Sequence, residues 1–317
     1  MRVLFWGTPE FATPALRALI GEGFDVVGVV TQPDRPVGRS RSTVQPSPVK
    51  RIAVDEGIPV LQPERPRGDE LLAQLSELEP ELSVVVAYGH ILPKAVIDLP
   101  SRGTVNIHGS LLPALRGAAP IQAAIREGLA ETGVTIMRMV PALDAGPIIL
   151  QSRTPVLDDE TYGELALRLS ELGALTLIEA LSLMELGVAR EEPQDERAAS
   201  HASKIDRGST WIDWTASAST VCRLIRSLDP KPGGLTTLRG VEVKLFGAKP
   251  APRIASMAPG QIASIDDMGI VVACGDGATR VTVVQPAGKR RLLPNDWARG
   301  RGAAAGDRFE MSPAPVS

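Results

Sequence analysis

The residue types best suited to chemistry stand two positions apart, in Asn106-Ile107-His108. Residues i and i+2 of a strand share one face, so Asn106 and His108 are expected to project the same way while Ile107 points into the core. An asparagine amide can donate to an oxyanion, and a neutral imidazole can accept a proton. The pair therefore predicts a site that stabilises a tetrahedral intermediate, although a histidine at a strand end is also consistent with a purely structural role.

A carboxylate that follows a later strand can complete this set. Asp144 lies in Leu143-Asp144-Ala145-Gly146, and a loop after a strand at 134–137 would return over the same end of the sheet. An aspartate near a histidine favours the charged imidazolium and fixes the orientation of the ring. The alternative is that Asp144 only caps a turn.

The sequence offers no side-chain nucleophile. No serine lies in a GxSxG motif, and Cys222 and Cys274 stand far apart in apolar surroundings. These two cysteines exclude a disulfide framework and a cysteine-based zinc site, and the three histidines form no HExxH pair. We therefore expect direct attack by an amine or water on a bound acyl group, without a metal ion.

The elements that would position these residues follow an alternating pattern. Short apolar runs and helix patterns succeed one another through the first part of the chain, which is typical of an α/β domain with a mostly parallel sheet. Ligands of such a sheet bind at the carboxyl ends of its strands. The predicted strands span 3–6, 26–30, 82–87, 104–108 and 134–137, and the predicted helices span 14–20, 48–56, 119–127 and 162–186.

Two common nucleotide-binding motifs are missing. A dinucleotide fingerprint that begins at Gly7 would need glycines at positions 9 and 12, which hold Pro9 and Ala12. The sequence also has no GxxxxGK[ST] phosphate loop. An NAD enzyme and a P-loop NTPase are therefore disfavoured.

The second part of the chain changes its pattern. After a helix at 217–228, short strands separated by turn residues favour a small β-barrel, with strands at 235–238, 241–246, 260–265, 270–273 and 280–284. The length of 317 residues is consistent with two domains. We predict a catalytic domain at 1–189, a linker at 190–205 and a second domain at 206–317.

Charge and hydropathy bear on partners and location. Residues 1–200 carry 18 basic and 27 acidic side chains, whereas residues 201–317 carry 16 basic and 10 acidic side chains. The basic second part could attract a nucleic acid or present an ordinary solvated surface. No apolar run approaches the ~20 residues of a membrane span, and Gly7 comes too early for a signal-peptide core. A cytoplasmic protein without a membrane partner is expected.

Clusters of basic residues are candidates for contact with phosphate groups. The segment 31–50 carries three arginines and one acidic residue, and it should border the crevice, either as a mobile loop or as a phosphate-contacting element. In the second part, Arg223 and Arg226 share a helix face, and a basic run follows a strand. That run is Lys289, Arg290 and Arg291.

Several motifs together resemble the folate-dependent formyltransferases. The segment Asn-x-His-x-Ser-Leu-Leu-Pro at 106–113, followed by Leu-Asp-x-Gly at 143–146, is typical of that family in general. The segment 31–50 and two motifs of the second part, Ile212-Asp213-Trp214 and Gln285-Pro286-Ala287-Gly288-Lys289, narrow the resemblance to the members that act on methionyl-tRNA. It covers nearly the whole chain.

This resemblance implies a fold, a reaction and a set of site residues. The fold would be a Rossmann-like catalytic domain followed by an OB-like barrel. The formyl group of 10-formyltetrahydrofolate would pass to the α-amine of methionyl initiator tRNA, for translation initiation, in a monomeric enzyme. Asn106 would donate to the oxyanion, and His108, oriented by Asp144, would take up the proton. The folate would contact Tyr88, Ile91, Ser110, Leu111, Leu112 and Pro113, and the tRNA would contact Arg39, Arg41, Arg223, Arg226, Lys289, Arg290 and Arg291.

Two alternatives share parts of this pattern. A formyl hydrolase, or a transferase onto the amine of a nucleotide sugar, would use the same three residues. A silent tRNA-binding protein would keep only the scaffold. The sequence also departs from many family members after Pro113, where Ala114 and Leu115 replace a basic and an aromatic residue.

Overall fold

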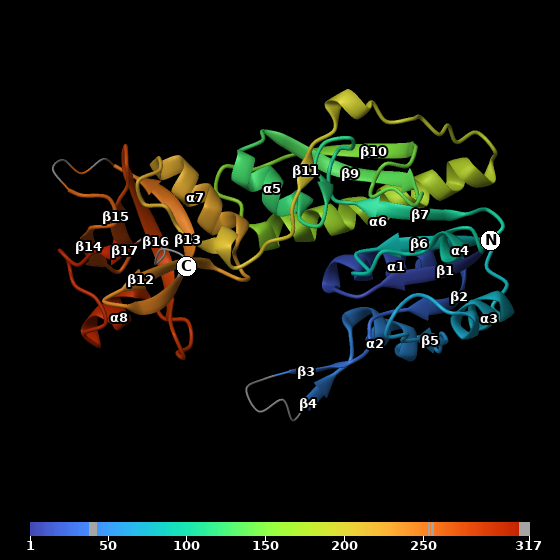
Figure 1. Ribbon diagram of the computed structural model, residues 1–317, viewed down its shortest axis with the longest axis horizontal. Coiled ribbons are helices and arrows are strands. Elements are labelled where there is room, and N and C mark those ends of the chain that lie inside the picture. Colours follow the sequence, from blue (N-terminus) through green and yellow to red (C-terminus); the bar gives the residue numbers. More distant parts are fainter. Residues whose placement is uncertain (38–42, 253, 255–256, 311–317) are drawn as a thin grey trace. The chain divides into compact units, whose positions relative to one another are not determined.

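The chain folds into two units, each assembled from segments that are distant in the sequence. A computed structural model describes residues 1–37, 43–252, 254 and 257–310 (Figure 1). One unit comprises Met1–Gly117, Thr132–Pro155 and Ala166–Ala202, and the other comprises Ala118–Glu131, Val156–Leu165 and Ser203–Ser317. The domain ranges predicted from the sequence stay predictions, because these units reflect packing rather than chain order.

The first unit is built on a mostly parallel sheet. Within the described residues, seven strands lie in the order β10-β9-β7-β6-β1-β2-β5, and β7 pairs in parallel with β6 and antiparallel with β9. The α/β sheet predicted from the sequence is thereby confirmed. The strands are β1 (Arg2–Gly7), β2 (Asp25–Val30), β5 (Val60–Leu61), β6 (Leu82–Val86), β7 (Thr104–His108), β9 (Glu131–Arg138) and β10 (Ile148–Pro155).

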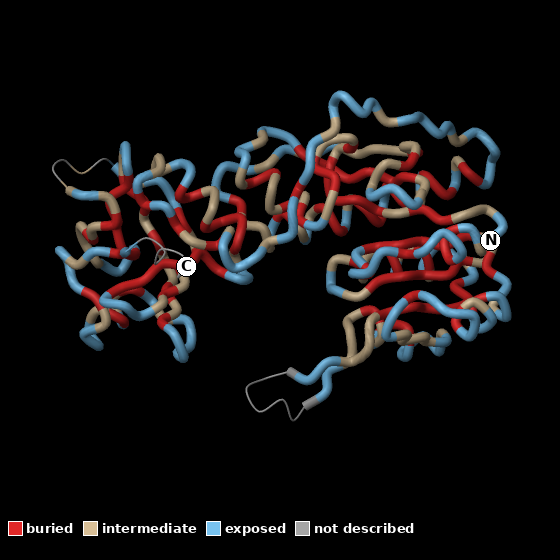
Figure 2. The backbone as a smooth tube through the Cα atoms, viewed as in Figure 1, coloured by how far each residue is buried: buried red, intermediate tan, exposed pale blue. Residues whose placement is uncertain are grey.

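Helices cover both faces of this sheet. All five residues of β6 are buried, as expected for a strand with helices on either side (Figure 2). One core joins the sheet to α1, α2 and α6, and a second core on Trp6 and Tyr88 joins it to α3 and α4. The helices are α1 (Thr13–Gly21), α2 (Pro48–Asp55), α3 (Asp69–Glu77), α4 (Lys94–Ile97) and α6 (Tyr162–Glu185).

Local sequence signals set where helix α2 begins. Ser47 precedes it in an extended conformation, and its hydroxyl oxygen accepts a hydrogen bond from the Lys50 backbone N–H at 3.0 Å. Pro48 occupies the first helical turn, where its missing N–H costs no hydrogen bond. The helix that the sequence predicts from residue 48 therefore begins at that residue.

The second unit holds an antiparallel barrel. Across the described residues, six strands lie in the order β14-β15-β16-β13-β12-β17. The two ends meet where Phe309 N–H donates to the Gly260 carbonyl and Ile262 N–H to the Asp307 carbonyl, so the sheet closes on itself. The predicted OB-like barrel is confirmed. Its strands are β12 (Gly234–Leu238), β13 (Val241–Ala251), β14 (Ile262–Asp266), β15 (Gly269–Ala273), β16 (Ala278–Pro286) and β17 (Phe309–Glu310).

Helices α5 (Pro120–Glu127), α7 (Ala218–Ser227) and α8 (Pro294–Arg299) pack in this second unit, and the sequence did not predict some short elements of either unit. Helix α7 packs on β13 and on α5, and α8 packs on β14 and β16. The sequence predicted α5 and α7 but not α8. It also did not predict α3, α4, β5, β10, the hairpin of β3 (Arg35–Val37) and β4 (Thr43–Gln45), or the pair β8 (Arg116–Gly117) and β11 (His201–Ala202). No helix of the described residues is long and apolar enough to span a membrane.

Candidate active site

Strand β7 carries the two residues that the sequence singled out, at the carboxyl end of the sheet. Asn106 lies opposite Val85 of β6, and His108 lies opposite Thr135 of β9. Ile107 is buried in the core, as the alternation predicted. Asn106 and His108 therefore share the other face of the strand.

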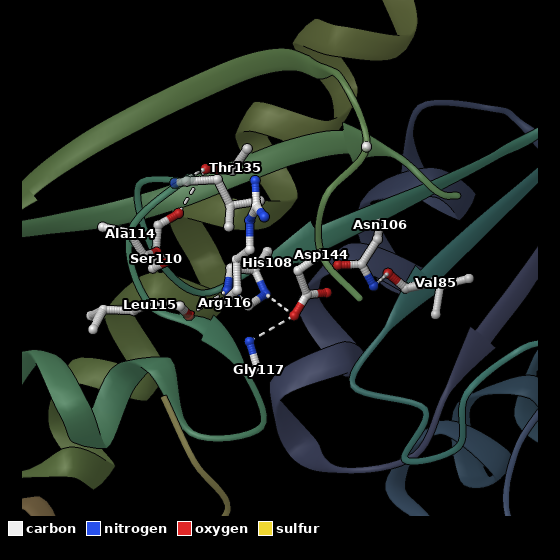
Figure 3. Close-up of polar contacts among 12 residues, drawn as sticks. Val85, Asn106, His108, Ser110, Ala114, Leu115, Arg116, Gly117, Thr135 and Asp144 are labelled. Atoms are coloured by element: carbon white, nitrogen blue, oxygen red, sulfur yellow. Dashed lines mark hydrogen bonds and ion pairs between the residues drawn. The ribbon is translucent and has the colours of Figure 1, made fainter. Parts of the chain in front are cut away.

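The imidazole of His108 is held in one orientation. The ring is buried, and Nε2 lies 3.0 Å from the carbonyl oxygen of Leu115 (Figure 3). A carbonyl can only accept, so Nε2 carries the hydrogen and donates it. The neutral ring then offers Nδ1 as its proton acceptor. Nδ1 lies 3.7 Å from Oδ2 of Asp144, at a distance that forms an ion pair once the ring is protonated.

The carboxylate of Asp144 is also held by the backbone of a neighbouring loop. Its Oδ2 accepts a hydrogen bond from the backbone N–H of Gly117 at 2.8 Å. Its own backbone has a φ of +50°, and Leu115, the partner of His108, has a φ of +61°. Non-glycine residues adopt this left-handed region at a cost, and such positions concentrate at functional sites. Asp144 therefore occupies a strained turn that the surrounding contacts have to stabilise.

The side-chain amide of Asn106 donates only one of its two hydrogens to the described residues. Its Nδ2 donates to the carbonyl of Val85 at 3.2 Å, and the side chain is half-buried. The amide has a second N–H, which has no protein acceptor among the described residues. In Figure 3, Asp144 lies between His108 and Asn106. The structure thus brings together all three residues predicted to form the catalytic set.

The loop after His108 is tied to the sheet by hydrogen bonds that the sequence did not reveal. Ser110 Oγ donates to the Ala114 carbonyl at 2.6 Å, and Thr135 Oγ1 donates to the Ser110 carbonyl at 2.7 Å. Gln151 Nε2 donates to both Leu112 O and Thr135 Oγ1. The sequence signal that could have indicated these hydrogen bonds is Thr135, a polar residue between apolar neighbours in strand β9. Ser110 and Leu112 are buried, whereas Leu111 and Pro113 are half-buried.

Tyr88 and Ile91 lie in contrasting surroundings. Tyr88 packs edge-on against Trp6 with ring centroids 5.1 Å apart, and burial raises the pKa of its hydroxyl to about 12. Ile91 is 77% exposed and lines a groove of about 390 Å³ together with Arg65, Arg67 and His90. Folate contacts by these residues stay predictions. No group of three His, Cys, Asp or Glu side chains able to hold a metal occurs among the residues that the structure describes.

Known protein families and curated relatives match this chain over nearly its whole length. The family described as Formyl transferase matches residues 1–181, and the one described as Formyl transferase, C-terminal domain matches residues 204–302. The methionyl-tRNA formyltransferase of Aromatoleum aromaticum is 46% identical over 312 residues, which cover 98% of each chain. That of Bacillus subtilis is 42% identical over 307 residues, which cover 96% of each chain. The chain belongs to the methionyl-tRNA formyltransferase family.

Solved structures show the same fold at low sequence identity. HypX from Aquifex aeolicus in complex with tetrahydrofolic acid superposes with a TM-score of 0.68 and 20% identity, over 97% of this chain and 48% of that one. The sugar 3N-formyl transferase WlaRD superposes with a TM-score of 0.65 and 17% identity, over 92% of this chain and 99% of that one. At these identities the likeness establishes the fold alone.

Two of the expected tRNA contacts of this formyltransferase, Arg39 and Arg41, lie outside the described residues. They follow β3 in the sequence. A hydrogen bond from Lys50 of helix α2 holds the residue Asp34, which directly precedes β3. Lys50 Nζ donates to Asp34 at 2.6 Å and to Gln62 at 2.7 Å, and the Lys50 hydrogen bond holds the pKa of the Asp34 carboxyl below its ordinary value.

The two arginines of α7 are buried or half-buried, whereas a contact with phosphate needs an accessible guanidinium. Arg226 is 9% exposed, and its Nη1 lies 3.9 Å from Asp159. Arg223 packs against Gly128, the left-handed residue that ends α5, so closely that a Cβ at Gly128 would lie 2.0 Å from the Arg223 Nη1. Arg223 thus packs against the end of α5 and Arg226 lies beside Asp159, and their contact with tRNA stays a prediction.

The basic run after β16 is exposed. Lys289 and Arg290 lie on the surface, and the guanidinium of Arg291 stacks 3.7 Å from the centroid of the Phe246 ring. Arg291 also donates to the carbonyl of Pro230. Lys289 and Arg290 are therefore more accessible to a phosphate than the two arginines of α7.

Proposed function

We propose that this enzyme transfers the formyl group of 10-formyltetrahydrofolate to the α-amine of methionyl initiator tRNA, for translation initiation. The observation that carries the proposal is the placement of Asn106, His108 and Asp144 together at the carboxyl end of the sheet. Its second support is the identity of 42–46% to methionyl-tRNA formyltransferases over nearly the full chain.

The geometry suggests how the chemistry proceeds. The uncharged amine attacks the formyl carbon and forms the new C–N bond. The second amide N–H of Asn106 donates to the oxyanion, and Nδ1 of His108 takes the amine proton. Asp144 stabilises the imidazolium from 3.7 Å. The bond from the formyl carbon to the folate nitrogen then breaks, and the proton passes from His108 to that nitrogen.

Folate is the proposed donor on chemical and comparative grounds. HypX was solved in complex with tetrahydrofolic acid, and WlaRD was solved in the presence of 5-N-formyl-THF. In this chain, the loop that contains the buried residues Ser110 and Leu112 is held by hydrogen bonds beside the reacting residues and can present its backbone to the donor. The other expected contacts are Leu111, Pro113, Tyr88 and Ile91.

The acceptor would be held through its phosphates. Exposed Lys289 and Arg290 in the barrel, and Arg39 and Arg41 beyond the described hairpin base, are the proposed contacts, while Arg223, Arg226 and Arg291 are less available. A monomer in the cytoplasm remains our expectation.

The test follows a labelled formyl group. The protein is incubated with formyl-labelled 10-formyltetrahydrofolate and methionyl initiator tRNA, and in parallel with a nucleotide amino sugar or with buffer alone. We expect the label on the methionyl α-amine. Label released as formate at the same rate in buffer would indicate a hydrolase, and label on the sugar would indicate a sugar transferase. Binding of tRNA without turnover would indicate a silent binder.

A further inference from the structure

The last segment of the first unit packs against the loops that hold His108 and Asp144. Residues 192–202, here called the strap, pair with Ile148 through Glu192 and with β8 through His201 and Ala202. The last pairing is tight, because a Cβ at Gly117 would lie 2.6 Å from the Ala202 carbonyl oxygen. The sequence predicted this segment only as a linker, and the structure packs it against the loops that hold His108 and Asp144.

Gln194 of the strap uses its whole side chain on these loops. Its Nε2 donates to the carbonyls of Asp144 and Gly146, each at 2.8 Å. Its Oε1 accepts from Arg116 Nε at 3.0 Å and Nη2 at 2.7 Å. Two N–H donors and one oxygen are all that a glutamine amide offers. Gln194 therefore joins the Asp144 loop to the loop that contains Arg116.

Both loops determine where the Asp144 carboxylate lies. Asp144 has a left-handed backbone, which its neighbours must stabilise, and its carboxylate accepts from Gly117, the residue after Arg116. Gln194 donates to the backbone carbonyl of Asp144 and accepts from the side chain of Arg116, which directly precedes Gly117. It thereby fixes both ends of the hydrogen bond that aims Asp144 at His108.

The rest of the strap supports the same arrangement. Ser200 Oγ accepts from the Leu115 N–H at 2.9 Å, and Leu115 is the residue whose carbonyl orients His108. Glu196 forms a two-pronged ion pair with the buried Arg116, and its hydrogen bonds raise the pKa of that guanidinium. The strap thus contacts Leu115 and Gly117, the hydrogen-bond partners of His108 and Asp144.

We propose that Gln194 is a positioning residue for the transfer reaction, and that it acts by holding the Asp144 turn through its two donor hydrogen bonds. The proposal rests on the proposed role of Asp144. It makes the strap, which belongs to the first unit, a working part of the catalytic site, since Gln194 supplies the side-chain donor to both the Asp144 and the Gly146 carbonyls of the strained turn.

Two substitutions separate the halves of the Gln194 amide. Gln194→Ala removes both donor and acceptor contacts. Gln194→Glu keeps an oxygen for Arg116 but cannot donate to the two carbonyls. Because a small misplacement of a reacting group can lower a rate by up to about 10²-fold, we expect each variant to lose about tenfold in kcat. The KM values for methionyl-tRNA and for the folate should change less than about twofold, since neither substrate contact is removed.

Controls distinguish this proposal from a general loss of structure. Arg197→Ala alters the same strap at an exposed side chain whose ion pair is with Asp195, and it should keep the wild-type kcat. Rates are expressed per folded molecule, measured by circular dichroism and thermal unfolding. A wild-type kcat in Gln194→Glu, or a loss that disappears after this correction, would overturn the proposal. Asp144→Ala serves as reference: full activity there would overturn the role of Asp144 itself, whereas its loss beside unimpaired Gln194 variants would overturn only this inference.

Discussion

Replacing Asn106 by alanine should lower kcat by about 10²- to 10³-fold, which corresponds to about 2.7–4 kcal/mol of transition-state stabilisation. The amide donates one hydrogen to Val85 at 3.2 Å, and its second hydrogen is the one expected to donate to the oxyanion. The oxyanion exists only on the reaction path, so the loss should fall on kcat, with little change in KM. Steady-state formylation with both substrates varied measures it.

A matched control is available for this substitution. Asn295 is a half-buried residue of the barrel unit that donates to Asp267, and Asn295→Ala should keep the wild-type rate. An activity loss below about tenfold in Asn106→Ala would be too small for an oxyanion donor and would contradict that role.

Replacing His108 by alanine should lower kcat by about 10²- to 10⁴-fold, the usual range for removing a general base. The reason is geometric. The Leu115 carbonyl fixes the hydrogen on Nε2, so Nδ1 faces Asp144 as the proton acceptor, and no other described imidazole shares this position. Initial rates of formyl transfer at saturating substrates measure the effect.

The control for His108 is a second histidine of the same unit. His201 lies in the strap and is exposed, and its backbone pairs with Arg116, so His201→Ala leaves that pairing possible. We expect it to keep nearly all activity. If His108→Ala raised only the KM for tRNA, the residue would act in binding and the proposed proton transfer would be wrong.

The sequence predicted the parts of the site that depend on local periodicity. Alternation along β7 placed Asn106 and His108 on one face with Ile107 in the core, and the structure confirms this arrangement. A position after a strand predicted that Asp144 returns to the same end of the sheet, and the 3.7 Å approach to His108 confirms it. Strand faces and strand ends follow from the period of two residues and from parallel topology.

Other features depend on contacts between distant segments, which periodicity does not encode. The i, i+3 spacing of Arg223 and Arg226 predicted one shared face, but α5 packs on that helix and Arg226 is buried beside Asp159. Gln194 stands in a charged stretch typical of a surface linker, yet it reaches Asp144, fifty positions earlier in the sequence. The left-handed backbone of Leu115 had no signal either, because leucine has no preference for that conformation.

The most direct test of the account compares three acceptors with one donor. Initial rates of formyl transfer from 10-formyltetrahydrofolate are measured for methionyl initiator tRNA, methionyl elongator tRNA and free methionine at the same concentration. The account predicts rapid formylation of the initiator tRNA and far slower reaction of the other two. Turnover of the folate without a formylated tRNA would contradict it.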